Sequence, residues 1–171
     1  MVDLGAGNGI KIRLLIETAV KEEHEFEYIP IDISHSSNLI LADTVAKVSP
    51  HLKATLLTAS YEQGVEWVRA NKKDRNFFTF IGNSISNFRD ADKEQFFEKL
   101  KACLKKGDML LIGVDLKKDP HLINKAYNSD IALSKAVTLN NLARINRELE
   151  GNFNLENFFT DSHYNPLAGQ N

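Results

Sequence analysis

A glycine-rich stretch near the start of the chain, Asp3-Leu-Gly-Ala-Gly-Asn-Gly9, constrains the fold more than any other feature of the sequence. It follows a short apolar segment, residues 1–4, and precedes residues 10–22, whose apolar positions recur with helical spacing. Glycines between a strand and a helix allow positive φ angles and let a ligand lie against the backbone. The N–H groups at a helix start also favour an anionic group. Taken alone, the motif equally fits a tight turn that packs a helix on a strand.

Strand-like and helix-like periodicity alternate along the chain, which predicts a doubly wound α/β sheet with right-handed crossovers. The predicted strands are residues 1–4, 26–33, 52–59, 77–81 and 109–114. The predicted helices are 10–22, a helix from Ser34 or Ser36 to about 48, 61–71, a helix from Asp90 or Asp92 to 105, one beginning at Asp119-Pro120, 130–150 and a short one within 152–159. Ligands of such sheets bind beyond the carboxyl ends of the strands. Four loops lie there, at residues 5–9, 32–36, 59–61 and 82–88.

Composition narrows the classes of protein to consider. A chain of 171 residues is one ordinary domain, and a net charge of -2 offers no electrostatic footprint for nucleic acid. No apolar run approaches ~18 residues, so we expect no membrane span and a cytoplasmic enzyme. The single cysteine, Cys103, excludes a disulfide within the chain and a cysteine metal cluster. Its spacing from Phe96, Leu100 and Leu104 predicts a packed thiol on the apolar stripe of a helix.

An acidic residue, Asp32, ends the second predicted strand roughly 20 residues after the glycine loop, where a carboxylate can accept hydrogen bonds from two ribose hydroxyls. The alternative interpretation is a turn or helix-capping aspartate. The two features together favour a nucleoside cofactor. Fingerprints for nicotinamide dinucleotides carry Gly-x-Gly-x-x-Gly. The spacing here is Gly-x-Gly-x-Gly after an acid, which resembles the first motif of class I S-adenosylmethionine-dependent methyltransferases.

The resemblance extends along nearly the whole chain. Blocks such as Tyr28-Ile-Pro-Ile-Asp-Ile-Ser34 and Phe80-Ile-Gly-Asn-Ser-Ile-Ser-Asn-Phe88 are similar to the histidine-specific N-methyltransferase family. That family includes the enzyme that trimethylates the histidine α-amine in ergothioneine biosynthesis, and related members methylate amines such as a prenylated tryptophan. The other blocks are residues 4–15, 107–120, 126–127, 139–149 and 163–166. The resemblance implies a Rossmann-like three-layer sandwich, S-adenosylmethionine as cofactor, and histidine or a related amino acid as substrate.

The same resemblance implies five cofactor-binding residues. Gly5 lies under the cofactor, Lys11 pairs with the carboxylate of its amino-acid end, and Asp32 binds its ribose. Ser60 and Tyr61 align with an Asp-aromatic pair beside the adenine, and serine replaces the acid of the family pattern. A serine hydroxyl can still accept a hydrogen bond from the adenine amine, without charge.

Four further residues are implied to bind the substrate. Asn87 and Tyr127 match residues that hold the amino acid, while Gly82 and Ser84 line the same loop as Asn87, beside the transferred methyl group. Ser86 stands where the family usually has glycine. No catalytic acid or base and no metal ligand is implied.

The family's domain extends beyond both ends of residues 1–171. The resemblance implies an upstream helical segment that supplies a tyrosine, and downstream strands followed by a Glu-x-Ser element that reads the substrate side chain. The family's sheet normally has seven strands and five are predicted here, so we expect an open edge. Such an edge predicts marginal stability, self-association through the edge, or a partner chain that completes the fold. Three hypotheses therefore stand: an N-methyltransferase for amino acid amines, a remnant that binds the cofactor without turnover, and a nicotinamide-dependent oxidoreductase.

Overall fold

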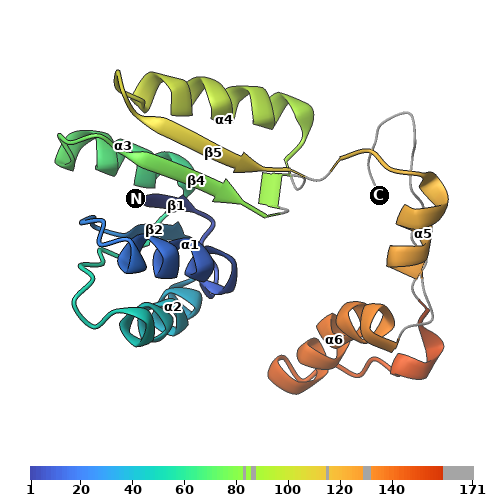
Figure 1. Cartoon of the computed structure of the whole chain (residues 1–171). Helices are drawn as coiled ribbons and strands as arrows, with labels where there is room; N and C mark the ends of the chain where they lie inside the picture. Colours follow the sequence, from blue (N-terminus) through green and yellow to red (C-terminus); the bar gives the residue numbers. More distant parts are fainter. Residues whose placement is uncertain (83, 86–87, 115, 129–131, 160–171) are drawn as a thin grey trace. The chain divides into compact units, whose positions relative to one another are not determined.

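The computed structural model describes residues 1–82, 84–85, 88–114, 116–128 and 132–159. The chain divides into two compact units, Met1–Asp115 and Leu116–Asn171. The first unit is an α/β sheet with helices, and the second is helical (Figure 1). The prediction of one methyltransferase core over 1–171 stays a prediction.

Five parallel strands form the sheet of the first unit, in the order β3-β2-β1-β4-β5. They are β1 (Val2–Leu4), β2 (Ile29–Asp32), β3 (Leu57–Thr58), β4 (Phe77–Ile81) and β5 (Met109–Gly113). This order confirms the predicted doubly wound α/β class, with its switch point between β1 and β4. Strand β3 is shorter than predicted because pairing lapses between the isolated Tyr28–Ala54 bridge and the Ile31–Leu57 pair.

Four helices connect these strands, and local capping accounts for where three of them begin. They are α1 (Ile10–Lys21), α2 (His35–Val48), α3 (Tyr61–Asn71) and α4 (Asp90–Cys103). Ser34 caps α2 by accepting a hydrogen bond from the N–H of Ser37. Ser60 and Gln63 form a reciprocal capping box at the start of α3. Gly9 caps α1 at φ 79, a left-handed conformation that glycine adopts readily.

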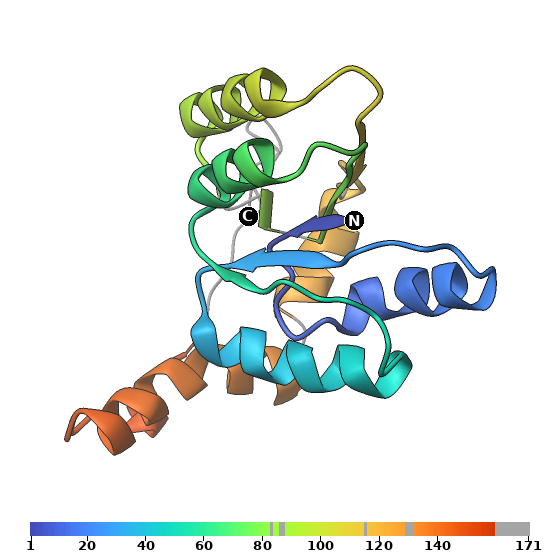
Figure 2. The same cartoon turned by 90° about the vertical axis from the view of Figure 1, so that its left-hand side faces the viewer.

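Helices α3 and α4 cover one face of the sheet, and α1 and α2 cover the other (Figure 2). Alternate strand residues point to each face. The buried residues under α3 and α4 form an apolar cluster of Val2, Leu4, Ile29, Ile31, Val65, Val68, Phe78, Phe80, Phe96, Leu100 and Cys103. Cys103 lies where its helical spacing predicts, as a buried thiol beside Leu100.

The opposite face mixes apolar and polar groups. Apolar side chains of α1 and α2 pack there around Tyr28, with Ile12, Ile16, Leu41 and Val45 buried. Two polar strand residues, Asp3 and Thr79, are also buried on this side of the molecule. The sheet therefore separates a layer with a large apolar cluster from one that carries the buried hydrogen-bonding groups Asp3 and Thr79.

The second unit consists of α5 (Pro120–Asn128), α6 (Ala132–Glu148) and a single 3-10 turn, Leu155–Asn157. The prediction of a short helix within 152–159 is wrong beyond that turn. The Asn146 amide bonds both the N–H and the C=O of Phe153 and holds this segment extended against α6. Among the described residues, no helix is long and apolar enough to cross a membrane.

Candidate functional site

A cleft of about 250 Å³ opens at the carboxyl ends of β1 and β4, at the switch point of the sheet. Its lining residues come from β1, the glycine loop, the start of α1 and the segment after β4. They are Asp3, Gly5, Ala6, Gly7, Asn8, Ile10, Lys11, Ile12, Ile81 and Ser84. The position is the one at which doubly wound sheets bind ligands.

Gly5 contributes only backbone atoms to the wall of the cleft. It adopts φ 72, and its N–H donates to the carbonyl of Ile31 at 2.9 Å. A Cβ at this position would lie 2.9 Å from the Tyr61 hydroxyl, so a side chain here would be strained and crowded. The predicted position of Gly5 under the cofactor stays a prediction.

Lys11 brings a cation into the cleft from the first turn of α1. Its Nζ lies under the segment after β4, since a Cβ added at Gly82 would be 2.6 Å from it. The structure thus brings the predicted cofactor residue Lys11 and the predicted substrate residue Gly82 together. Ser84 lines the same cleft.

Asp32 clamps two loops at the end of β2. Its Oδ2 accepts a hydrogen bond from the N–H of Gly7 at 2.9 Å, and its Oδ1 accepts one from the N–H of Ser34 at 2.8 Å. The turn role considered from the sequence is therefore confirmed. A carboxylate has about four acceptor sites, so two remain for a ribose diol. The ribose role stays a prediction.

Ser60 and Tyr61 do not line the cleft. The Ser60 hydroxyl accepts the N–H of Gln63 at 3.3 Å as a helix cap. The Tyr61 ring packs among aromatic side chains on the apolar face, 5.3 Å from Phe80 and 5.7 Å from Phe96 between ring centroids. Its hydroxyl bonds Ser84, and burial raises the pKa of Tyr61 despite that bond. The predicted adenine contacts of both residues stay predictions.

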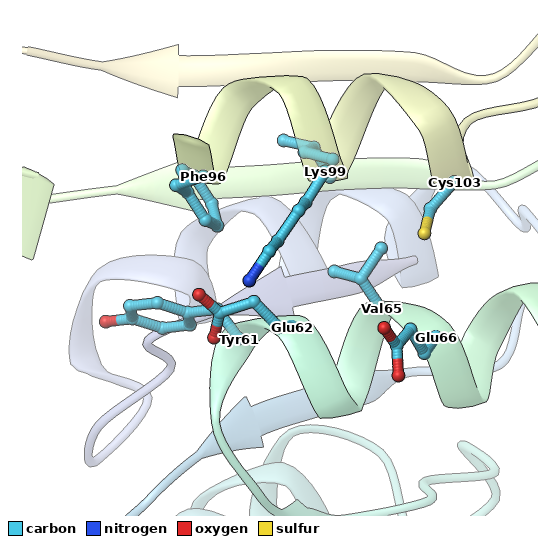
Figure 3. A pocket seen from close by; sticks show the side chains of 8 residues that line it. Tyr61, Glu62, Val65, Glu66, Phe96, Lys99 and Cys103 are labelled. Carbon is cyan, nitrogen blue, oxygen red and sulfur yellow. The ribbon is translucent and has the colours of Figure 1, made fainter. Parts of the chain in front are cut away.

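Tyr61 also borders a crevice between α3 and α4 (Figure 3). Phe96 and Cys103 lie along it, and the side chain of Lys99 extends from α4 toward Glu62 on α3 (Figure 3). Its volume of about 10 Å³ holds no more than about one water molecule. The crevice is therefore a packing gap, and the larger cleft at the switch point is the candidate ligand site.

Asp3 also lines the cleft. It was not predicted from the sequence as a binding residue, because it was considered only as part of the glycine pattern. Its side chain is 4% exposed and accepts hydrogen bonds from the Tyr28 hydroxyl at 2.9 Å and the Thr79 hydroxyl at 2.7 Å. Burial raises the pKa of Asp3 to about 6, although these two bonds lower it. The sequence feature that could have indicated this role is a single acidic residue within an otherwise apolar predicted strand.

The remaining predicted substrate residues are not placed at the cleft. Asn87 lies outside the described residues. Tyr127 lies in α5 of the second unit, and its side chain is outside the described part of the chain. Among the described residues, no group of three or more His, Cys, Asp or Glu side chains is arranged to hold a metal ion.

The model of a protein family described as histidine-specific methyltransferase, SAM-dependent, matches residues 1–171. The chain belongs to this family. The match decides between the two cofactor classes that the glycine loop left open, and it agrees with the glycine loop, Lys11 and Asp32 lying at one switch point.

Two curated relatives and one solved structure are similar to this methyltransferase-family chain at modest sequence identity. Ergothioneine biosynthesis protein 1 of Neurospora crassa is 31% identical over 150 residues, which cover 85% of this chain and 17% of that protein. Histidine N-alpha-methyltransferase of Mycobacterium tuberculosis is 27% identical over 158 residues, covering 92% of this chain and 49% of that protein. A solved structure of mycolic acid cyclopropane synthase CmaA1 aligns over 86% of this chain and 46% of its own, with 17% identity and a TM-score of 0.48. The chain thus spans half or less of the curated relatives named here.

Proposed function

We propose that the chain provides the cofactor-binding core of an S-adenosylmethionine-dependent N-methyltransferase that acts on the α-amine of histidine or a related amino acid. The observation that carries the proposal is the cleft at the switch point, which combines the glycine loop, Lys11 and Ser84 in a member of this family. A small amino acid is the substrate class that this family membership supports.

Three described residues, Lys11, Asp32 and Gly5, match different chemical groups of S-adenosylmethionine. The Lys11 ammonium is a partner for the cofactor's carboxylate, and charge-assisted hydrogen bonds of this kind are strong. Asp32 keeps two acceptor sites for the ribose diol while it clamps Gly7. Gly5 presents backbone without a side chain on the cleft.

Positioning accounts for the catalysis on this proposal. When bound, S-adenosylmethionine supplies an electrophilic methyl group, and no general acid or base is assigned to the chain. The family resemblance assigns Asn87 and Tyr127 to the amino acid, whose amine would react in its deprotonated form. Gly82 and Ser84 would lie beside the reacting groups. Holding the reacting atoms about 3–3.5 Å apart and in line is worth several orders of magnitude in rate.

Calorimetric titration of the chain with S-adenosylhomocysteine, followed by mass-spectrometric assay of histidine with S-adenosylmethionine, tests the proposal. We expect binding and a mass gain of one or more methyl groups on histidine. Binding without methylation of any amino acid amine would support the alternative, a remnant that binds the cofactor without turnover. Binding of NAD(H) with none of S-adenosylhomocysteine would overturn the proposal.

Asp32→Ala is expected to abolish S-adenosylhomocysteine binding while the fold persists, because the ribose contacts and the clamp on the glycine loop are both lost. Asp43→Ala is the matched control, since Asp43 is an exposed aspartate on α2 that forms a surface ion pair with Lys47. Equal affinity in Asp32→Ala and the unaltered chain would restrict Asp32 to its turn role.

A cytoplasmic location and self-association belong to the same proposal. Strand β5 is one of the two outer strands of the described sheet, with β3 at the other edge, and its side chains Met109 and Leu111 are 54% and 42% exposed. An unpaired edge with exposed apolar residues favours association. Analytical ultracentrifugation is expected to show dimers or larger species that a Leu111→Lys substitution disperses.

A further inference from the structure

The Tyr61 ring lies against both ends of the segment that follows β4. Its centroid is 5.3 Å from that of Phe80 and 6.0 Å from that of Phe88. These two phenylalanines lie on either side of residues 82–87, since Phe80 belongs to β4 and Phe88 comes just before α4. The first residue of α3 therefore packs beside both ends of the segment that carries Ser84.

The hydroxyl group of Tyr61 extends this contact to Ser84 itself. A Cβ built at Gly5 would lie 2.9 Å from the Tyr61 hydroxyl oxygen and 3.5 Å from Ser84 Oγ. The two oxygens thus converge on the space that Gly5 leaves open, and they share a hydrogen bond. A side chain at position 5 would crowd this pair, so the glycine and the two hydroxyl groups fit together.

The packing of the Tyr61 ring determines where its oxygen lies. The ring is also 5.7 Å from Phe96, within the apolar cluster between the sheet and the helices α3 and α4 (Figure 3). A tyrosine side chain has only two torsion angles, so a ring held by aromatic neighbours also fixes its hydroxyl group. Burial raises the pKa of Tyr61, which keeps this hydroxyl group protonated.

Ser84 presents the other half of this pair to the cleft. Ser84 lines the cleft at the switch point, whereas Tyr61 borders the crevice between α3 and α4. A serine hydroxyl has one hydrogen and two acceptor lone pairs, so Ser84 keeps an acceptor site when it shares one bond with Tyr61. Tyr61 thus orients a hydroxyl group that lines the cleft, from a position outside the cleft.

We propose that Tyr61 is a positioning residue, which fixes Ser84 so that Ser84 Oγ accepts an N–H of the substrate amine and directs the nitrogen lone pair at the methyl group. The inference rests on the proposed function. It gives the Tyr61 hydroxyl a role on the substrate side that neither the family resemblance nor the comparisons assign.

The chemistry of the amine explains why one such bond is useful. A neutral primary amine has two N–H donors and one lone pair. Holding one N–H restricts the direction of the lone pair and so favours in-line attack. The amine nitrogen forms the new C–N bond while the C–S bond breaks, its electron pair stays on sulfur, and the methylated nitrogen then loses a proton to water.

The first experiment compares a ligand that has N–H donors with one that has none. Histidine and its N,N,N-trimethyl betaine are titrated calorimetrically into the full chain saturated with S-adenosylhomocysteine at pH 8. Tyr61→Phe and Ser84→Ala are each expected to weaken histidine about fivefold, the value of one hydrogen bond, and to leave the betaine unchanged. Equal weakening of both ligands would assign Tyr61 a structural role and overturn the inference.

Two controls accompany this comparison. Ser49→Ala removes a serine hydroxyl at the far end of α2 and is expected to leave both ligands unchanged. Tyr61→Phe keeps the ring and its packing, so its affinity for S-adenosylhomocysteine is expected to equal that of the unaltered chain. A loss of S-adenosylhomocysteine affinity in Tyr61→Phe would assign the hydroxyl group to the cofactor and overturn the inference.

The second experiment asks whether Tyr61 acts through Ser84. In the Ser84→Ala background, Tyr61→Phe is expected to cause no further loss of histidine affinity, because the oriented hydroxyl group is already absent. Residues that act as one unit give such non-additive effects. Two losses that multiply in the double variant would mean that the residues act independently, which would overturn the positioning role.

These outcomes are distinguishable from failure of the proposed function. If the unaltered chain saturated with S-adenosylhomocysteine binds no histidine, the proposed substrate and this inference both fall. If it binds histidine without methylating it, the proposed turnover falls, and the comparison of histidine with the betaine still decides whether Tyr61 positions Ser84. If it methylates histidine and Tyr61→Phe binds histidine equally well, only the role of Tyr61 falls.

Discussion

The two faces of the sheet differ in what they bury. Under α3 and α4 the buried layer consists of apolar side chains, with a cluster of aromatic rings around Phe96. Under α1 and α2 the sheet buries Asp3 and Thr79, which hydrogen-bond each other. Only the second face continues into the cleft. The apolar face thus holds the larger buried apolar cluster, and the polar face holds the groups suited to binding a ligand.

The largest expected effect on the free energy of unfolding comes from removing a buried aromatic ring of the apolar face. Phe96 is 2% exposed and stacks with Phe88 at 5.4 Å between ring centroids. Phe96→Ala is expected to lower the free energy of unfolding by about 3–5 kcal/mol, because transfer free energy and packing are both lost. Urea unfolding followed by the fluorescence of Trp67, the only tryptophan of the chain, measures it. A loss below about 1 kcal/mol would contradict the assignment of stability to this face.

A substitution on the polar face is expected to raise the free energy of unfolding, whereas Phe96→Ala lowers it. The pKa of Asp3 is raised by folding to about 6, from an ordinary value of 3.8, so its charge destabilises the unligated chain above pH 6. Asp3→Asn is expected to stabilise the chain at pH 8, by on the order of 2–3 kcal/mol at most.

The same reasoning gives a pH dependence. The unaltered chain is expected to gain stability as pH falls from about 6 toward about 4, because Asp3 becomes neutral, and Asp3→Asn is expected to lack this gain. Thermal unfolding at several pH values measures it. Equal pH profiles for the two chains would show that burial of Asp3 carries no charge penalty.

A smaller effect is expected where α3 begins, beside the glycine loop. Ser60→Ala removes the hydroxyl that caps the N–H of Gln63 and is expected to cost about 1 kcal/mol. Ser60→Asp is the matched variant, since aspartate also caps helices and restores the acid of the family pattern. Unchanged S-adenosylhomocysteine affinity in both variants would confine Ser60 to the capping role.

The smallest effect is expected on the solvent side of α1. Leu14 is 71% exposed, although α1 covers the polar face. Leu14→Ser is expected to change the free energy of unfolding by no more than about 0.5 kcal/mol. A larger loss in the same urea titration would mean that Leu14 is buried in solution, as self-association through this surface would produce.

Interactions between residues close in sequence explain why the helices, the strands and their order could be predicted from the sequence. The prediction of a helix over 61–71 matches α3 because Ser60 and Gln63 supply a complete local cap. The prediction of a strand over 77–81 matches β4, since a continuous apolar run suits a strand buried on both faces. Alternation of such segments was enough to predict the parallel sheet, and the glycine spacing with Asp32 was enough to predict the end of the sheet at which the site lies.

Tertiary structure alone decided which groups meet there. Asp3 and Thr79 are 76 residues apart in sequence, and they bond because β1 and β4 are neighbours in the sheet. The Tyr61 ring packs on the apolar face because Phe80 and Phe96 offer it a buried partner surface. Periodicity reports which face of its own element a residue occupies, whereas hydrogen-bond partners and charge depend on strands that fold against each other from distant parts of the chain.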